Sequence, residues 1–447
     1  MRYKKQIVYK LVFIPLLLLL LQTQAQEVKT ITLNEAIGLS IKNSKQLKLS
    51  KARIDEAIAA TKEATERKLP DASISGSYLR IAKPTINYKT GGGSSDTSGG
   101  GGGTAATPTI NQALYGMANL SLPLYSGLKI RYGIESAKYL EQATMLDADN
   151  DKQGIILNTI AAYINLFKAN AATKLVEENL EQSRKRDTDF SNLEKNGLLA
   201  RNDLLKAQLQ TSNIELALLD AQNSIQLATV NMNLMLGLPE TTKLLPDSAS
   251  IQQAGELKTI EEYEQLAAQN RNDVKALGYR EKAADAAVKA AKGNYYPSIA
   301  LTGGYVAADI PSFLTVTNAL NIGIGVKYSL SSLWKTKSKI EQAQAQQQQL
   351  QASGDMLTDE IHLSINKAYQ GYASGLKKIE VYNKAVEQAT ENYRISKNKY
   401  DNSLLLLTDL LDADVAQLQA KLNLTLAKAD VVLSYQTLLQ KAGMLNQ

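Results

Sequence analysis

The sequence predicts a mainly helical protein that is built twice from one helix–strand–strand–helix unit and whose strands form a β-barrel. Long stretches without proline, rich in Ala, Leu, Gln, Lys and Glu, favour helix. Two pairs of short strands interrupt them, and the whole order of segments occurs twice. We expect a first repeat over 26–240, a linker over 241–258 and a second repeat over 259–447.

The first 25 residues have the organisation of a secretory signal peptide. Basic residues come first, an apolar run from Leu11 to Leu21 follows, and Thr23-Gln24-Ala25 provides a small-residue cleavage site. The alternative is an N-terminal membrane anchor, but the run is short compared with the roughly 20 apolar residues that a spanning helix needs. We therefore expect an exported chain that is either soluble or a β-barrel protein.

Composition excludes several classes of function. Four of the 50 Lys and Arg residues lie in the signal segment, which leaves 46 against 44 acidic residues and removes the argument for a nucleic-acid partner. There is no cysteine, so disulfides, thiolate catalysis and a lipid anchor on an N-terminal cysteine are excluded. His362 is the only histidine and lies in a helical stretch. We predict no catalytic residues, no cofactor and no metal site.

The helical stretches of the two repeats correspond in order and length. A helix from about 127 to 195 would be about 100 Å long, which is more than a globular domain needs. Apolar residues recur at intervals of three and four, with alanine and glutamine between them, as in helices that pack along their length. The expected helices are 33–68, 127–195, 201–236, 260–292, 334–400 and 408–442.

Matching motifs define the repeat. Gly76 and Gly303 follow Leu-Pro and Tyr-Pro dipeptides and lie 227 residues apart, whereas Asp203-Leu204-Leu205 and Asp409-Leu410-Leu411 lie 206 residues apart. The difference of 21 residues falls in the Gly/Ser-rich loop 89–110 of the first repeat. Surface loops accept insertions at little cost in free energy.

The strands, expected at about 72–88, 111–126, 296–307 and 319–332, alternate apolar and polar or small residues. This pattern fits a soluble sheet with one face on a core, and it also fits a transmembrane barrel. Four strands cannot close in lipid, but three chains would supply twelve. Tyr125, Tyr328 and Trp334 lie at strand-to-helix junctions, where aromatic side chains favour a membrane interface.

The two-copy order, the signal peptide, the Leu-Pro or Tyr-Pro entry into the strand and the stretch from Tyr400 to Leu424 resemble the TolC-type outer-membrane efflux proteins (outer membrane factors). The resemblance covers nearly the whole mature chain. It implies a homotrimer in which a 12-strand outer-membrane β-barrel continues into a long periplasmic α-helical barrel.

The resemblance also implies which residues close the periplasmic aperture. By residue match these are Asp409, Asp412 and Tyr400, with the carboxylates forming acidic rings around the threefold axis. The alternative for Asp409 is a carboxylate that stabilises the first turn of its helix, and Asp203 occupies the equivalent place. Position 206 is Lys206, so Asp412 has no acidic equivalent.

The tips of two helical hairpins resemble the motifs that meet a periplasmic adaptor protein. Exposed leucines at a turn favour a covering partner, and packing of the turn within the chain is the alternative. The tip residues are Gly197, Leu198, Leu199 and Ala200 in the first repeat and Ser403, Leu404, Leu405 and Leu406 in the second.

The predicted function is a passive channel in the outer membrane of a Gram-negative cell, with a large periplasmic part and no enzymatic activity. Its expected partners are two further copies of the chain, outer-membrane lipid, a periplasmic adaptor (membrane fusion) protein and an inner-membrane transporter of the RND, ABC or MFS type. Such a channel would serve a tripartite efflux or type I secretion system. The alternative is an exported coiled-coil structural or adhesin protein without channel activity.

Overall fold

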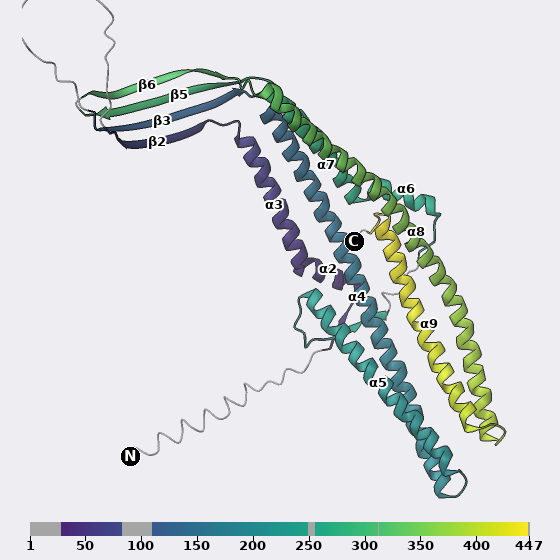
Figure 1. Cartoon of the computed structure of the whole chain (residues 1–447). Coiled ribbons are helices and arrows are strands. Elements are labelled where there is room, and N and C mark those ends of the chain that lie inside the picture. The colour runs from purple at the N-terminus through teal and green to yellow at the C-terminus, as the bar shows by residue number, and fades with distance from the viewer. Residues whose placement is uncertain (1–27, 83–109, 249–254, 312, 446–447) are drawn as a thin grey trace, which may run out of the picture. The chain divides into compact units, whose positions relative to one another are not determined.

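The computed structural model describes residues 28–82, 110–248, 255–311 and 313–445 (Figure 1). The predicted signal peptide, 1–25, and all of the predicted Gly/Ser-rich loop except Ile110 lie outside these ranges. None of the helices within them combines the length and apolar character that a membrane-spanning helix requires.

The described chain divides into two compact units, and each draws on both repeats. The helical unit comprises the described residues up to Ala52, Leu146–Val274 and the residues from Asp355 onward. The sheet unit comprises Arg53–Met145 and Lys275–Gly354. Equivalent parts of the two repeats therefore fold together, and the boundary between the repeats is not the boundary between the units.

The elements of the two repeats follow the same order (Figure 1). The predicted long helices are confirmed, since α4 has 67 residues and α8 has 70. The first repeat and the linker contain β1 Val28–Ile31, α2 Leu33–Asn43, α3 Lys45–Glu66, β2 Asp71–Arg80, β3 Gln112–Tyr125, α4 Lys129–Lys195, α5 Arg201–Leu236 and β4 Lys243–Pro246. The second contains α6 Ile260–Asn270, α7 Asn272–Lys292, β5 Ser298–Ile310, β6 Leu314–Lys327, α8 Ser332–Asp401 and α9 Leu407–Lys441.

Several expected boundaries differ from those observed. The single helices expected over 33–68 and 260–292 are each interrupted, at Ser44 and at Arg271, where the backbone is not helical. Ser44 accepts a hydrogen bond from the Leu47 amide and so caps α3. Within the described residues β2 ends at Arg80 instead of continuing toward 88, and β6 begins five residues before the expected 319, because its first residue pairs with the end of β5.

The same cap starts the first helix of each repeat. Thr32 accepts a hydrogen bond from the Glu35 amide before α2, and Thr259 accepts one from the Glu262 amide before α6. The Thr-x-x-Glu spacing is that of a capping box, which satisfies amides left free at a helix N-terminus.

The two repeats also end in the same way within the helical unit. α5 ends at Gly237 with φ 69°, and Gly443 after α9 has φ 70°. A Cβ on Gly237 would lie 2.9 Å from the Asn43 Cβ, and one on Gly443 would lie 3.1 Å from the Asn270 Cβ. Both glycines therefore allow a left-handed helix end. They also allow close approach to a helix break in the same repeat, between α2 and α3 for Gly237 and between α6 and α7 for Gly443.

The linker between the repeats is tied to the N-terminal strand. β1 and β4 pair in parallel, and the Tyr163 hydroxyl lies 2.9 Å from the Ile31 carbonyl oxygen and 3.1 Å from that of Asp247. Tyr163 is fully buried among apolar side chains of α2, α4 and α5. This cluster is the largest core of the helical unit.

The sheet unit contains one antiparallel sheet in the order β2-β3-β5-β6. The second repeat thus adds its strand pair directly to that of the first. Within the described residues β2 pairs only with β3 and β6 pairs only with β5, so the sheet has two free edges.

Two glycines bring together the turns that enter and leave the sheet. A Cβ on Gly293, after α7, would overlap the Gly127 backbone oxygen, and a Cβ on Gly127, before α4, would overlap that of Gly293. Gly127 also has φ 65°. Any larger residue must push the two backbones apart.

We expect Gly293→Ala to lower the free energy of unfolding by about 1–3 kcal/mol because of this overlap. Gly133→Ala is the matched control, since a Cβ at this position in α4 has no neighbour within 4 Å and alanine favours helix. Guanidinium unfolding in detergent, followed by circular dichroism, compares the two. Equal midpoints would contradict the close contact.

Candidate functional site

One face of the sheet is apolar and exposed. Paired residues form rows across the four strands, such as Ile74, Ala118, Tyr305 and Leu320. Ile74 is 91% exposed and Leu320 is 81% exposed. Apolar side chains with this exposure, arranged in consecutive rows, form a patch whose contact with water is unfavourable.

The opposite face of the sheet is small and polar. A neighbouring row contains Ser73, Asn119, Gly304 and Asn321, and another contains Ser121, Thr302 and Gly323. The predicted alternation is therefore present in the folded sheet. It separates a face suited to hydrocarbon from a face suited to water.

Exposed aromatic residues surround the ends of the strands that lead into the helices. Tyr125 is the last residue of β3, Tyr328 follows β6, and Trp334, 65% exposed, lies in the first turn of α8. Tyr295 and Tyr296, which were not among the predicted interface residues, are also exposed, just before β5. The Tyr-Pro entry motif is the signal that could have identified them.

The two hairpin tips have the same backbone conformation. At the α4–α5 turn the Leu198 amide donates to the Leu193 carbonyl oxygen at 2.9 Å, and at the α8–α9 turn the Leu404 amide donates to that of Lys399 at 2.8 Å. Gly197 and Ser403 have φ 71° and φ 57°. These are Schellman-type helix ends, which favour glycine at the left-handed position.

The predicted docking leucines divide into two groups. Leu198 and Leu404 are each 75% exposed, and Leu406 is also exposed. Leu199 and Leu405 are partly buried, and Leu199 packs against a small apolar core near the tips. Packing within the chain therefore accounts for Leu199, whereas it does not account for the three exposed leucines.

Both hairpins share a small core near their tips, which we call the tip cluster. It contains Phe190, Leu204, Ala207, Leu407, Leu410 and Leu411, with Leu199, Tyr393 and Tyr400 packed against it. The Tyr400 ring lies 5.7 Å from the Phe190 ring, centroid to centroid. Burial raises the pKa of Tyr400, and the Asp203 and Asp401 charges raise it further. Tyr400 thus joins the second hairpin to the first.

The predicted gate carboxylates lie at the start of α9 and face solvent. Asp409 and Asp412 are exposed, and the described residues provide neither with a hydrogen-bond or ion-pair partner. At the equivalent place on α5, Asp203 lies 3.3 Å from Lys206. The second hairpin therefore presents two uncompensated carboxylates where the first presents a neutral pair.

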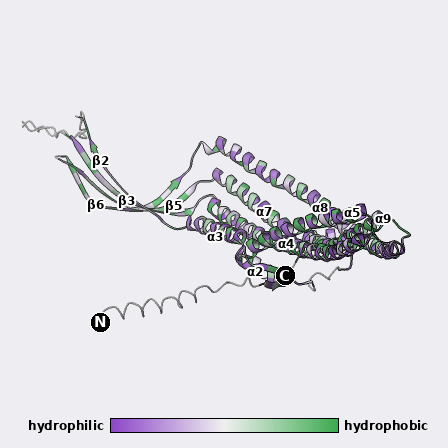
Figure 2. Ribbon diagram, turned by 90° about the horizontal axis from the view of Figure 1, so that it is seen from below, coloured by the Kyte–Doolittle hydropathy of each residue, from purple (hydrophilic) through white to green (hydrophobic). Residues whose placement is uncertain are grey.

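Two helices of the helical unit have exposed apolar stripes. Along α8 the stripe residues are separated by 7, 18 and 14 positions, each close to a whole number of turns. Hydrophobic and hydrophilic colours alternate along this helix in Figure 2. The α8 stripe consists of Met356, Leu363, Val381 and Ile395, and the α5 stripe consists of Leu205, Leu209, Leu216, Leu219, Leu227 and Leu234.

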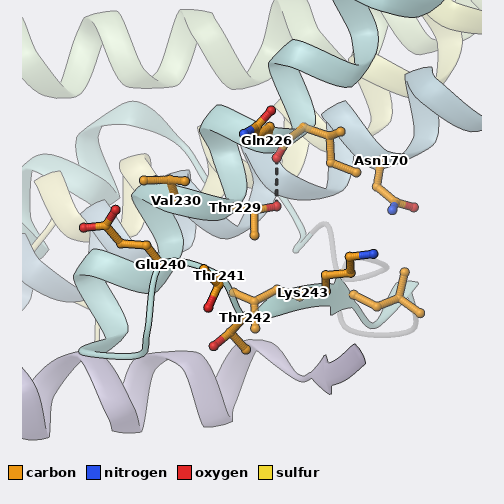
Figure 3. Close-up of a pocket in the computed structure, with 11 residues that line it drawn as sticks. Asn170, Gln226, Thr229, Val230, Glu240, Thr241, Thr242 and Lys243 are labelled. Atoms are coloured by element: carbon orange, nitrogen blue, oxygen red, sulfur yellow. Dashed lines mark hydrogen bonds between the residues drawn. The ribbon is translucent and has the colours of Figure 1, made fainter. Parts of the chain in front are cut away.

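The helical unit also contains a cavity of about 620 Å³ between α4, α5 and the segment that leads into β4 (Figure 3). Its charged lining residues are Glu240 and Lys243, and the Thr229 hydroxyl on its wall donates to the Ile225 carbonyl oxygen at 2.7 Å. Among the described residues no group of three His, Asp or Glu side chains could hold a metal ion.

The chain is similar to known outer-membrane proteins over most of its length. The sequence model of the outer membrane efflux protein family matches residues 36–238 and 264–444. The outer membrane efflux protein BepC of Brucella suis biovar 1 (strain 1330) is 24% identical over 427 residues, which cover 92% of this chain and 85% of BepC.

Solved structures have the same fold. The outer membrane protein VceC of Vibrio cholerae has a TM-score of 0.75 and 20% identity, over 92% of this chain and 96% of VceC. The outer-membrane channel OprN has a TM-score of 0.76 and 18% identity, over 92% of this chain and 89% of OprN. The chain therefore belongs to the outer membrane efflux protein family, and it is an efflux protein of the outer membrane.

Proposed function

We propose that three copies of this chain assemble into one channel, with twelve strands closing a barrel in the outer membrane. The observation that carries this proposal is the four-stranded sheet with one exposed apolar face and two free edges. Backbone groups at a free edge cannot be hydrogen-bonded by lipid, so β6 of one copy must pair with β2 of the next. The small, polar face would then line the lumen.

The aromatic residues at the strand-to-helix junctions support the same assembly. Tyr125, Tyr328 and Trp334, with Tyr295 and Tyr296, would lie at the periplasmic interface of the membrane. Their rings would contact lipid while their polar atoms reach water.

The helical hairpins would form a tunnel with one seam between each pair of neighbouring copies. α4 bonds to α5 through Arg184 and Glu215, and to α9 through Lys168 and Asp430. The apolar stripes of α5 and α8 are left exposed, so the α5 stripe of one copy would cover the α8 stripe of the next. Each leucine buried there would contribute about 1.5–3 kcal/mol.

In the cell this channel would provide the exit for substrates that an inner-membrane transporter delivers through a periplasmic adaptor. The protruding leucines at both hairpin tips are the surface that such an adaptor would cover. The carboxylates at the start of α9 would form two acidic rings at the narrow end of the tunnel. Tyr400 would hold the second hairpin against the first, because its ring packs in the tip cluster.

We expect the mature chain in detergent to migrate as a trimer before boiling and to conduct ions in planar bilayers. Leu209→Asp combined with Leu216→Asp should convert most of it to monomer, because charges then replace apolar contacts in the seam. Gln222→Asp adds a charge to an exposed position away from the stripe and is the control. A monomer without conductance from the unaltered chain would contradict the proposed assembly.

We expect Asp409→Asn or Asp412→Asn to weaken block of the channel by multivalent cations at least tenfold, because each change removes three carboxylates from the trimer. Asp203→Asn should change the block less than twofold, since Lys206 already neutralises Asp203. Titration of single-channel current with a trivalent cation on the periplasmic side measures both. Unchanged block in both gate variants would refute the acidic rings.

We expect Leu198→Asp and Leu404→Asp to abolish copurification with the periplasmic adaptor encoded in the same genome, while trimer formation and conductance stay unchanged. Both side chains protrude from the tips, so a charge there opposes docking without disturbing the fold. Asn192→Asp, an exposed polar position one turn from the tip, is the control. Normal adaptor binding by both leucine variants would exclude the tips as the docking surface.

A further inference from the structure

Basic residues begin the long helix of each repeat, directly after the sheet. In α8, Lys335 and Lys337 follow Trp334, which is 65% exposed. With the offset of 206 residues, Lys129 and Arg131 occupy the equivalent places in α4. Both repeats therefore place two cations at the same spacing where a strand leads into a long helix (Figure 1).

Acidic residues are missing from the same parts of the chain. The segments 110–134, 286–308 and 310–340 contain no Asp or Glu. The first turns of α4 and α8 thus have no acidic residue, whereas α2, α5, α6, α7 and α9 each have one there. The N-terminus of a helix is the positive end of its dipole, so cations at this end are unfavourable unless an anion accompanies them.

The chain itself provides little compensation for these cations. Lys337 lies 3.8 Å from Glu341, but both side chains are exposed, so this ion pair is weak. Arg131, Lys335 and Lys339 are exposed and have no ion-pair partner among the described residues. The starts of α4 and α8 therefore present positive charge that is open to an external anion.

The close contact between Gly127 and Gly293 brings further cations together beside an exposed tyrosine. A Cβ on Gly293 would lie 2.6 Å from the Lys129 Cγ. A Cβ on Gly127 would lie 3.1 Å from the Cβ of Tyr296, which is exposed. Lys292 precedes Gly293, is exposed, and forms no ion pair within the described ranges. The end of α7 and the start of α4 thus form one basic surface with an aromatic edge.

The depth of the cations indicates which anion they meet. Lys335 and Lys337 lie about 4.5 Å and 7.5 Å along α8 from its first residue, Ser332. The headgroup region on each side of a bilayer is roughly 5–8 Å thick. Exposed aromatic side chains such as Trp334 favour the same level. With the sheet in the membrane, these cations would lie among the headgroups of the periplasmic leaflet.

We propose that these residues bind the phosphate groups of anionic phospholipids in the periplasmic leaflet of the outer membrane. Phosphate oxygens accept charge-assisted hydrogen bonds from arginine and lysine, and the lipid supplies the anion that the starts of α4 and α8 lack. The lysine stems would contact the apolar boundary while their charges reach the phosphates. The inference rests on the proposed placement of the sheet in the membrane. We call the binding residues the basic junction: Lys129, Arg131, Lys292, Lys335, Lys337 and Lys339.

The fluorescence of Trp334 tests the inference, because this residue is the only tryptophan of the chain. The channel is reconstituted in vesicles of phosphatidylcholine with increasing fractions of phosphatidylglycerol, and one of the two lipids carries bromine near its ester groups. Bromine quenches tryptophan at short range, so the two series give the affinity for phosphatidylglycerol relative to phosphatidylcholine beside Trp334. We expect a ratio of at least fivefold, since each cation near an anionic lipid contributes roughly a factor of five.

Charge-removing variants identify the residues responsible. Combining Lys335→Gln, Lys337→Gln and Lys339→Gln should lower the ratio below twofold. Lys327→Gln is the control, because Lys327 ends β6 on the small, polar face of the sheet and should leave the fivefold preference intact. A ratio below twofold for the unaltered chain would overturn the inference. A fivefold preference that survives in the triple variant, or is lost equally in the control, would overturn it as well.

A second reporter examines the basic surface at the start of α4. Trp334→Phe combined with Tyr296→Trp moves the single tryptophan beside Lys292. We again expect a ratio of at least fivefold, and Arg131→Gln with Lys292→Gln should lower it below twofold. A preference that persists without both charges would overturn the assignment of these two residues. An unaltered chain that does not insert into the vesicles would instead contradict the proposed barrel, and the inference would fall with it.

Discussion

Two free sheet edges impose the main constraint on this protein. The strands β2 and β6 each leave a row of backbone N–H and C=O groups without partners in the described chain. Water can bond to such groups, but hydrocarbon cannot, and each unsatisfied group costs several kcal/mol in lipid. The exposed apolar face of the same sheet is more stable in contact with lipid than with water. One chain cannot satisfy both demands, whereas the proposed pairing with further copies of the chain would satisfy them.

The internal repeat explains how one chain provides both edges. The strand pair of the second repeat adds to that of the first by ordinary antiparallel pairing between β3 and β5. The edges that remain are the outer strand of each repeat. A contact between β6 and the β2 of another copy would therefore link a second repeat to a first repeat, as β3 and β5 do within the chain. In the helical unit the repeats are equally related, because Gly237 meets Asn43 as Gly443 meets Asn270.

The sequence was sufficient for the order of elements and for the alternating strands, because both depend on local periodicity. It did not predict the interruptions at Ser44 and Arg271, since neither position has a proline and each break depends on contact with a distant helix end. The sequence suggested one shared docking role for all the tip leucines, although in the fold Leu198 is exposed and Leu199 is partly buried. The buried ion pair of 2.8 Å between Arg186 of α4 and Asp414 of α9 was not predictable, because the two residues lie 228 positions apart and no local pattern relates them.

Because the two repeats are similar, α9 needs a feature that selects one of the two long helices as its packing partner. Residues that differ between the repeats can provide it. α4 and α8 are alike, and so are α5 and α9, so an α9 helix could pack against either long helix. The ion pair between Arg186 and Asp414 removes this ambiguity, because Asn392, the residue of α8 that corresponds to Arg186, offers Asp414 no charge and burial of an unpaired carboxylate is strongly unfavourable. Within about a turn and a half toward the tip, Asp203 is paired with Lys206, whereas Asp409 and Asp412 have no ion-pair partner among the described residues. The same few turns of α5 and α9 thus contain both differences between the repeats, the ion pair of Asp414 and the unpaired carboxylates of Asp409 and Asp412. The ion pair specifies which helices pack together, and the unpaired carboxylates give the start of α9 a negative charge at the proposed aperture.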